Sequence, residues 1–177
     1  MQIQKKQEYE GHSWISLVDL SQGYKKPVIS SGGLCPASGS LKDHRDGKSV
    51  EGKIGDDSKT KFTVAMCLPI RAEKGDKFKD VKDKYDAIVK KLEKLKQDKT
   101  ILYNSNSNNC SMWATGFMND NGFPGFIPEK SMFAEADVRC ITPYTVSQEI
   151  LLSCLKYKNN INKITEVHAS CIDLLKK

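Results

Sequence analysis

One segment of this chain has a strongly one-sided pattern of apolar residues, and it limits the possible folds more than any other feature. Large apolar side chains recur there at steps of three and four, and the positions between them are almost all lysine, aspartate or glutamate. The apolar positions are Phe78, Val81, Tyr85, Ile88, Leu92 and Leu95. This spacing predicts an amphipathic helix within residues 74–99, starting near Asp76, that packs one stripe of side chains against a sheet.

Segments before this helix have the patterns of strands. Residues 9–20 alternate apolar and polar positions, residues 27–31 form a second short segment, and residues 62–68 are a continuous apolar run that Pro69 ends. These patterns predict two short strands and one central buried strand. Residues 32–59 are rich in Gly, Ser, Asp and Lys, which predicts a long mobile loop of the kind that serves a site.

The residues after the amphipathic helix predict more helices and no second domain. One helix is expected from Cys110 to about Asp120, ending at Asn121 and Gly122. Two others are expected over residues 142–155 and 161–175. The sequence has no internal repeat and no linker. We therefore expect a single α+β domain over residues 1–177, with a small antiparallel sheet packed against helices.

Composition and charge exclude several classes of function. At 177 residues, with 38% hydrophobic and 28% charged residues, the chain is long enough to bury a core. No apolar run approaches a membrane span, and residues 1–8 lack the apolar centre of a secretory signal. The net charge of +6 suits an anionic surface such as cell wall, although most lysines lie in the solvated pattern of residues 74–99. Nucleic acid is not an expected partner, because the sequence has no arginine-rich tract and no aromatic–basic platform.

The six cysteines lie at positions 35, 67, 110, 140, 154 and 171. They form no C-x-x-C pair and no close cluster with histidine, so we expect neither a metal site nor another cofactor. Their even number permits up to three disulfides without requiring any. Cys67, Cys154 and Cys171 fall in apolar patterns, where a buried free thiol behaves as a small hydrophobic group.

Cys110 differs from the other cysteines because it stands where an Asn- and Ser-rich loop, residues 103–109, turns into a helix. Unpaired backbone N–H groups and the positive end of the helix macrodipole favour the thiolate there, and the thiolate is the nucleophilic form of cysteine. Cys110 is therefore the candidate nucleophile. The alternative is an inert thiol at a helix start.

A nucleophilic cysteine is commonly paired with a histidine base, and the chain has three histidines. His12 follows a glycine near the start of the first predicted strand, which would fix the direction of its ring. His44 lies in a charged loop, and His168 shares a predicted helix face with apolar residues, as a core or interface histidine does. We expect His12 to be the base, with a structural strand histidine as the alternative.

Two further pairs of polar residues belong with this hypothesis. Asp56 and Asp57 precede the predicted central strand, and either carboxylate is a candidate to orient the histidine; ordinary turn chemistry is the alternative for both. Asn108 and Asn109 precede Cys110. Their side chains either cap the helix or also line an oxyanion site with the N–H of Cys110.

The order of these elements resembles a known family. The elements are Gly11-His12-Ser13-Trp14-Ile15, Gly33-Leu34-Cys35-Pro36, Asp56-Asp57, and Tyr103-Asn104 followed by Asn108-Asn109-Cys110 at a helix start. This order resembles the circularly permuted papain-like fold. More narrowly, it is similar to permuted NlpC-type cysteine peptidases, including toxin and effector domains that type VI and related secretion systems deliver. The resemblance spans roughly residues 10–122.

The resemblance implies a thiol amidase or endopeptidase that uses no cofactor. Cys110 would be the nucleophile, and His12 the base and then the acid. The orienting residue would be Asp57 or Asp56. Positions lining the substrate and the oxyanion would be Tyr103, Asn108 and Asn109.

The implied substrate is a peptide of peptidoglycan, cleaved in the periplasm of a target cell. The protein would then be an antibacterial effector, secreted without a signal peptide and neutralised in its producer by an immunity protein. The same permuted core also resembles isopeptidases that remove ubiquitin-like modifiers, and lipid acyltransferases that use a thiol intermediate. An inert binding protein of the same fold is a further alternative.

Overall fold

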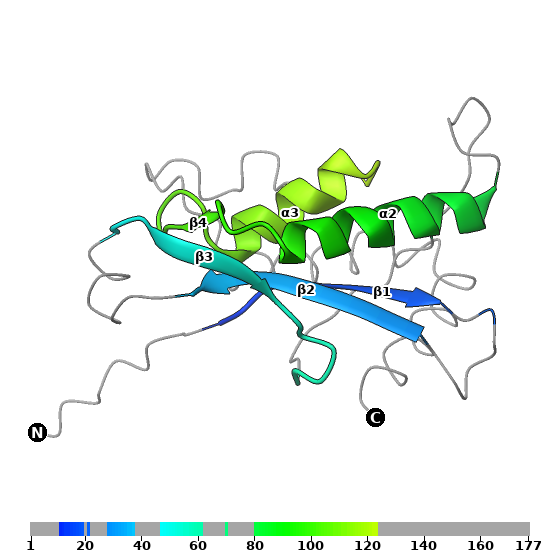
Figure 1. Cartoon of the computed structure of the whole chain (residues 1–177), viewed down its shortest axis with the longest axis horizontal. Helices are drawn as coiled ribbons and strands as arrows, with labels where there is room; N and C mark the ends of the chain where they lie inside the picture. Colours follow the sequence, from blue (N-terminus) through cyan, green and yellow to red (C-terminus); the bar gives the residue numbers. More distant parts are fainter. Residues whose placement is uncertain are drawn as a thin grey trace, which may run out of the picture.

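The computed structural model describes residues 11–19, 21, 28–37, 47–61, 70 and 80–123 (Figure 1). These residues form a small antiparallel sheet and two helices. In chain order the elements are β1 (Ile15–Asp19), β2 (Val28–Pro36), β3 (Val50–Gly55), α2 (Val81–Lys96), β4 (Leu102–Tyr103) and α3 (Cys110–Asp120).

The four strands form one sheet in the order β1-β2-β3-β4, and each neighbouring pair is antiparallel. The central strand β2 pairs on both of its sides. Ile15 of β1 lies opposite Gly32, and the next residue of β2, Gly33, lies opposite Gly55 of β3. β1 pairs with β2 up to Gly32 and β3 pairs with it from Gly33 onward, so the start of β1 and the end of β3 lie beside the same point of β2, on its two sides.

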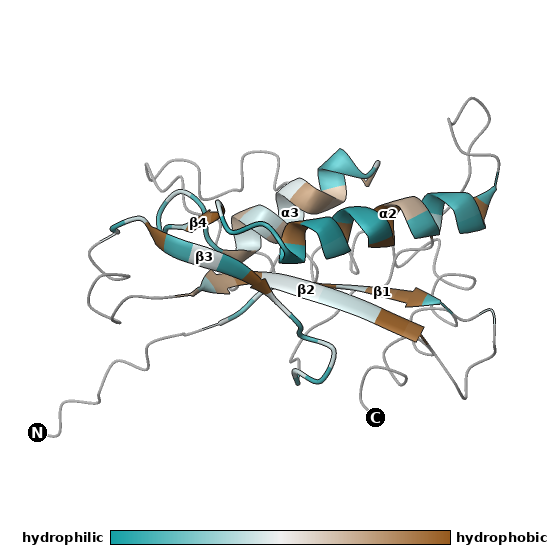
Figure 2. Ribbon diagram, in the orientation of Figure 1, coloured by the Kyte–Doolittle hydropathy of each residue, from teal (hydrophilic) through white to brown (hydrophobic). Residues whose placement is uncertain are grey.

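Both helices pack against one face of the sheet (Figure 1). α2 buries Ile88 and Leu92 and exposes its charged side, so that most of its ribbon is hydrophilic in Figure 2. This is the packing expected of a helix with one apolar stripe. The core between helices and sheet consists of Ile15, Leu17, Leu34, Ile54, Ile88, Leu92, Ala114 and Phe117. The architecture is α+β, as the sequence predicts.

The predicted long loop over residues 32–59 is wrong in two places. β2 continues to Pro36 instead of ending near Ser31, and β3 occupies residues 50–55. The sequence did not indicate the extension of β2 beyond Ser31, because it begins with Gly32 and Gly33 and glycine normally weakens a strand pattern. β3 is concealed by its charged positions, although Val50 and Ile54 lie on one side of the strand and alternate with exposed side chains.

The two helices are close to their predicted positions. α3 has the predicted bounds, and Gly122 follows it with a φ of +84°, a left-handed conformation that favours glycine. α2 begins later than the predicted Asp76, because Asp80 is its N-cap and accepts a hydrogen bond from the N–H of Asp83 at 2.9 Å. Neither helix in the described ranges is long and apolar enough to cross a membrane.

Other predicted elements lie outside the described residues. They are the strand over residues 62–68, the helices over residues 142–155 and 161–175, and the histidines His44 and His168.

Candidate active site

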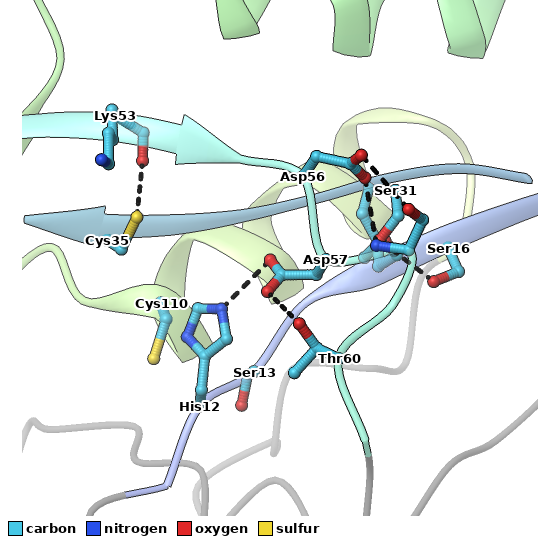
Figure 3. Close-up of polar contacts among 12 residues, drawn as sticks. His12, Ser13, Ser16, Ser31, Cys35, Lys53, Asp56, Asp57, Thr60 and Cys110 are labelled. Carbon is cyan, nitrogen blue, oxygen red and sulfur yellow. Dashed lines mark hydrogen bonds and ion pairs between the residues drawn. The ribbon is translucent and has the colours of Figure 1, made fainter. Parts of the chain in front are cut away.

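Three side chains from distant parts of the sequence meet where β1 and β3 approach each other (Figure 3). His12 lies just ahead of β1, Asp57 lies in the turn after β3, and Cys110 is the first residue of α3. The side chain of His12 is hydrogen-bonded to Asp57, and the sulfur of Cys110 lies beside its ring (Figure 3). The fold therefore brings together the cysteine and the histidine that the sequence indicated as candidate nucleophile and base.

Cys110 owes its position to the cap of α3. The side-chain oxygen of Asn109 accepts hydrogen bonds from the N–H groups of Ser111 and Met112, both at 3.0 Å. The amide nitrogen of Asn109 donates to the carbonyl of Ser105, also at 3.0 Å. Asn109 thus fastens the loop to the helix start, which is the usual role of asparagine at an N-cap. Cys110 is buried, with 6% of its surface exposed.

The thiol of Cys110 is acidic for a buried cysteine. Burial raises the pKa of this thiol. Hydrogen bonds from His12 and from the backbone N–H of Ser13, together with the charge of His12, lower the pKa by more than burial raises it. The net pKa of Cys110 lies below its ordinary value. Cys35 behaves in the opposite way, because burial raises the pKa of its thiol. A low pKa increases the thiolate fraction at neutral pH.

The imidazole of His12 is held on several sides. Its Nε2 lies 3.2 Å from Oδ2 of Asp57, and its ring stacks on Trp14 with 5.6 Å between ring centroids. In Figure 3 the sulfur of Cys110 lies beside the ring, away from Asp57. With Nε2–H donating to the carboxylate, Nδ1 is the nitrogen that faces the sulfur and can accept its proton. His12 precedes β1 instead of lying within it, so neighbouring side chains, and not strand pairing, fix its ring.

The pKa of His12 is raised above its ordinary value. The largest cause is the hydrogen bond with Cys110; burial acts in the opposite direction, and Asp57 raises the pKa through its hydrogen bond and its charge. A raised pKa of His12 and a lowered pKa of Cys110 have the same consequence. Both favour an imidazolium–thiolate pair over the neutral pair.

The structure distinguishes between the two candidate orienting carboxylates. Asp57 reaches His12 with Oδ2, and its Oδ1 accepts a hydrogen bond from the hydroxyl of Thr60 at 3.0 Å. Asp56 instead accepts hydrogen bonds from the N–H and the hydroxyl of Ser58, at 3.0 and 3.2 Å. Asp56 thus has the ordinary turn role, whereas the carboxylate on the histidine is Asp57.

A pair of serines that the sequence did not indicate connects the segment of His12 to the start of α3. Ser13, next to His12, is hydrogen-bonded through its hydroxyl to the hydroxyl of Ser111, next to Cys110, at 2.8 Å. Ser111 is completely buried. Because 98 residues separate the two serines in the sequence, no local pattern indicates their contact. The bond fixes the backbone of the histidine segment to the first turn of α3.

The remaining predicted site residues support the loop before Cys110. The amide of Asn108 donates to the carbonyl of Leu102 at 2.5 Å, and its backbone pairs with that of Asn104. Tyr103 lies in β4, paired with Val50 of β3. The structure therefore gives the Asn108 side chain a role in the loop, and Asn109 a role as the cap.

The chemistry of the site follows from these contacts. A thiol with a lowered pKa, a histidine on its sulfur and a carboxylate on the second ring nitrogen form the arrangement of nucleophile, base and orienting group. Cys110 is a free thiol, and so is Cys35, the other cysteine in the described ranges. Within those ranges, no three His, Cys, Asp or Glu side chains gather in a way that could hold a metal ion.

Comparisons of this chain with protein-family models, with curated proteins and with solved structures gave no significant match.

Proposed function

We propose that this protein is a cysteine hydrolase of the permuted papain-like, NlpC type, and that it cleaves amide bonds in the peptides of peptidoglycan. The observation that carries the proposal is the placement of His12, which is hydrogen-bonded to Asp57 on one side and has the sulfur of Cys110 beside its ring on the other (Figure 3). Here one nitrogen faces a carboxylate and the other a thiol whose pKa is lowered.

The first step of the proposed reaction forms a carbon–sulfur bond. Nδ1 of His12 holds the proton of Cys110, and the thiolate attacks the amide carbonyl carbon. The carbonyl π electrons move to the oxygen, which becomes an oxyanion. The Asn109 side chain caps the N–H groups of Ser111 and Met112. The N–H of Cys110, at the first position of α3, is the donor we assign to the oxyanion.

The second step breaks the carbon–nitrogen bond and regenerates the enzyme. His12 gives its proton to the leaving amine, which departs and leaves a thioester on Cys110. A water molecule then loses a proton to His12 and attacks the thioester, releasing a carboxylic acid and restoring the thiol. Asp57 keeps the same ring nitrogen protonated throughout, so that Nδ1 remains available for proton transfer.

The order of the site residues along the chain supports the permuted arrangement. Papain-like enzymes of the ordinary arrangement carry the cysteine ahead of the histidine and its orienting residue. Here the order is His12, Asp57 and Cys110, while the nucleophile still begins a helix that packs on an antiparallel sheet. A permutation changes where the chain begins and keeps such contacts.

The choice of peptidoglycan rests on the resemblance described above and on charge. The net charge of +6 favours association with an anionic polymer such as cell wall. In this proposal the protein is an antibacterial effector that is secreted without a signal peptide. It acts in the periplasm of the target cell, and an immunity protein protects the producer.

The direct test is digestion of purified cell-wall sacculi, with mass spectrometry of the released fragments. We expect the wild-type protein to release peptide fragments with new carboxyl ends, and Cys110→Ala to release none. His12→Ala should fold and lose activity by a factor on the order of 10²–10⁴, the usual contribution of a general base.

Cys35→Ala is the matched control, because Cys35 is a free thiol on β2 whose pKa is raised. It should digest sacculi like the wild type. The same fragments from Cys110→Ala would remove Cys110 from the mechanism. Failure of the wild type to cut sacculi, with Cys110 still reacting faster than Cys35 toward an alkylating agent, would reject the substrate and retain the activated thiol.

A further inference from the structure

Gly33 of β2 lies directly beneath the contact between His12 and Asp57. A Cβ atom built on Gly33 would lie 2.6 Å from Oδ2 of Asp57 and 2.6 Å from Nε2 of His12. It would also lie 2.9 Å from Cε1 of the same ring. Favourable contacts between such atoms lie near 3.5–4.0 Å, so even the smallest side chain at position 33 overlaps both partners.

The backbone conformation does not explain the glycine. Among the described residues, Gly47 and Gly122 have positive φ, and Gly33 does not. Alanine can therefore adopt the backbone of residue 33, and the constraint there is one of space. The three atoms nearest to that Cβ all belong to the side chains of Asp57 and His12.

We propose that Gly33 is a positioning residue of the catalytic site: the lack of a side chain at this position provides the space in which Asp57 meets His12. This inference rests on the proposed function, because it assigns Gly33 a purpose in holding the base of that reaction. A side chain there would push against the ends of two flexible side chains. The least costly relief is to separate the carboxylate from the imidazole and leave the sheet intact.

The neighbouring glycines provide matched controls. Gly32 precedes Gly33 and faces the opposite side of the strand, where a Cβ would lie 2.8 Å from Leu92 and 2.9 Å from Ile54, both in the core. Gly55 lies opposite Gly33 in the sheet, and a Cβ there would make an ordinary contact of 3.5 Å with the sulfur of Cys35. Gly33→Ala thus tests overlap with the site, Gly32→Ala tests overlap with the core, and Gly55→Ala tests a position where a Cβ overlaps nothing.

The experiment measures the rate of alkylation of Cys110 by iodoacetamide as a function of pH in the full chain. Mass spectrometry of peptides separates Cys110 from the other cysteines, and Cys35 serves as the internal reference. We expect Gly33→Ala to raise the apparent pKa of Cys110 and to reduce its thiolate reactivity at pH 6 by roughly tenfold, the change that one pKa unit produces. Gly55→Ala should leave the profile unchanged. Gly32→Ala should lower the melting temperature and leave the profile unchanged.

A double-mutant cycle with Asp57→Ala identifies the mechanism. If Gly33 provides the space in which Asp57 meets His12, Gly33→Ala should change the Cys110 profile less in Asp57→Ala than in the wild type, because only the overlap with His12 remains. If Gly33→Ala itself lowers the melting temperature, Asp57→Ala in the same chain should restore part of the loss, since it removes one of the overlapping groups. A change in the profile as large in Asp57→Ala as in the wild type contradicts the proposed role.

Failure of this inference is distinguishable from failure of the proposed function. An ordinary thiol pKa for Cys110 in the wild-type protein overturns the hydrolase. A low wild-type pKa that is the same in Gly33→Ala and in Gly55→Ala leaves the hydrolase standing and overturns the role of Gly33.

Discussion

The two helices α2 and α3 begin with the same kind of cap, but the cap of α2 is negatively charged and that of α3 is neutral. The N-cap of α2 is Asp80, at an exposed helix start, and a second carboxylate, Asp83, lies in its first turn. The N-cap of α3 is Asn109, which is 5% exposed, and no acidic residue lies in its first turn. Both side chains accept hydrogen bonds from the N–H groups of the first turn.

This difference shows how one local motif serves two purposes. Carboxylates at the start of α2 offset the positive end of its macrodipole and favour the helix itself. At α3 the neutral side-chain amide of Asn109 accepts hydrogen bonds from the N–H groups of that helix's own first turn and adds no negative charge. The positive end of the helix is therefore available to the thiolate of Cys110, which His12 and the N–H of Ser13 also stabilise.

Exchanging the charge between the two caps tests this comparison most strongly. Asn109→Asp keeps a good N-cap and places a carboxylate beside Cys110, where a like charge disfavours the thiolate. We expect the pKa of Cys110 to rise by about one unit or more, with a fall of roughly tenfold in its alkylation rate at pH 6. The reverse change at the other helix, Asp80→Asn, should leave Cys110 unaffected.

Asn109→Ser is the control for the lost contact between Asn109 and the carbonyl of Ser105. Serine retains the capping oxygen and carries neither the amide nor a charge. If Asn109→Ser and Asn109→Asp raise the pKa of Cys110 equally, the geometry of the cap matters and its lack of charge does not. The difference in charge between the two helix starts would then have no effect on Cys110.

The sequence was informative where a pattern is local. The stripe that includes Ile88 and Leu92 predicted α2, and the junction at Cys110 predicted the start of α3. Each of these depends on residues within a few turns of one another. The pairing of β2 with β3 was hidden, since Gly32 and Gly33 carry no apolar signal and are needed for space and not for burial.

The sequence indicated the candidate pair Cys110 and His12, which the fold places side by side (Figure 3), but not the residues that hold the pair in place. A cysteine at a helix start and an early histidine are chemical signals that a single sequence displays. The choice of Asp57 over Asp56 depends on which carboxylate the turn directs toward His12, and both are equally placed in the sequence. The contact of Ser13 with Ser111 depends on the tertiary fold alone.

The serine contact offers a second, smaller test of the α3 start. Ser111→Ala removes the bond to Ser13, and we expect a loss of about 1–2 kcal/mol in the free energy of unfolding, as for a buried hydrogen bond. The pKa of Cys110 should rise slightly, because Ser111 and the Ser13 segment both support the thiolate. Denaturant unfolding and the alkylation profile measure the two effects.

Ser31→Ala is the matched control for that change. Ser31 is also a buried serine, 1% exposed, and its hydroxyl donates to the carbonyl of Ile15 in the sheet. It should lose similar stability and leave the Cys110 profile as it is. A shift of that profile in Ser31→Ala, or its absence in Ser111→Ala, would mean that the serine contact does not position the nucleophile.

The smallest effect concerns the dependence of stability on pH that Cys110 and His12 produce at the start of α3. Taken separately, the raised pKa of His12 stabilises the fold below its ordinary value of about 6.5, and the gain is lost as pH rises through the folded value. The lowered pKa of Cys110 stabilises the fold above about 8.5, and the gain is lost as pH falls through the folded value.

These two contributions depend on each other, because the hydrogen bond with Cys110 is the largest cause of the His12 shift. We therefore expect the difference in unfolding free energy between the wild type and Cys110→Ser to be greatest between about pH 6.5 and 8.5 and to decrease on both sides. Cys35→Ser should behave differently. The raised pKa of Cys35 destabilises the fold only above its ordinary value, so this substitution should improve stability at alkaline pH alone. A flat difference for Cys110→Ser from pH 5 to 10 would mean that the sulfur and the imidazole are both neutral, and the charge that distinguishes the two helix starts would be absent.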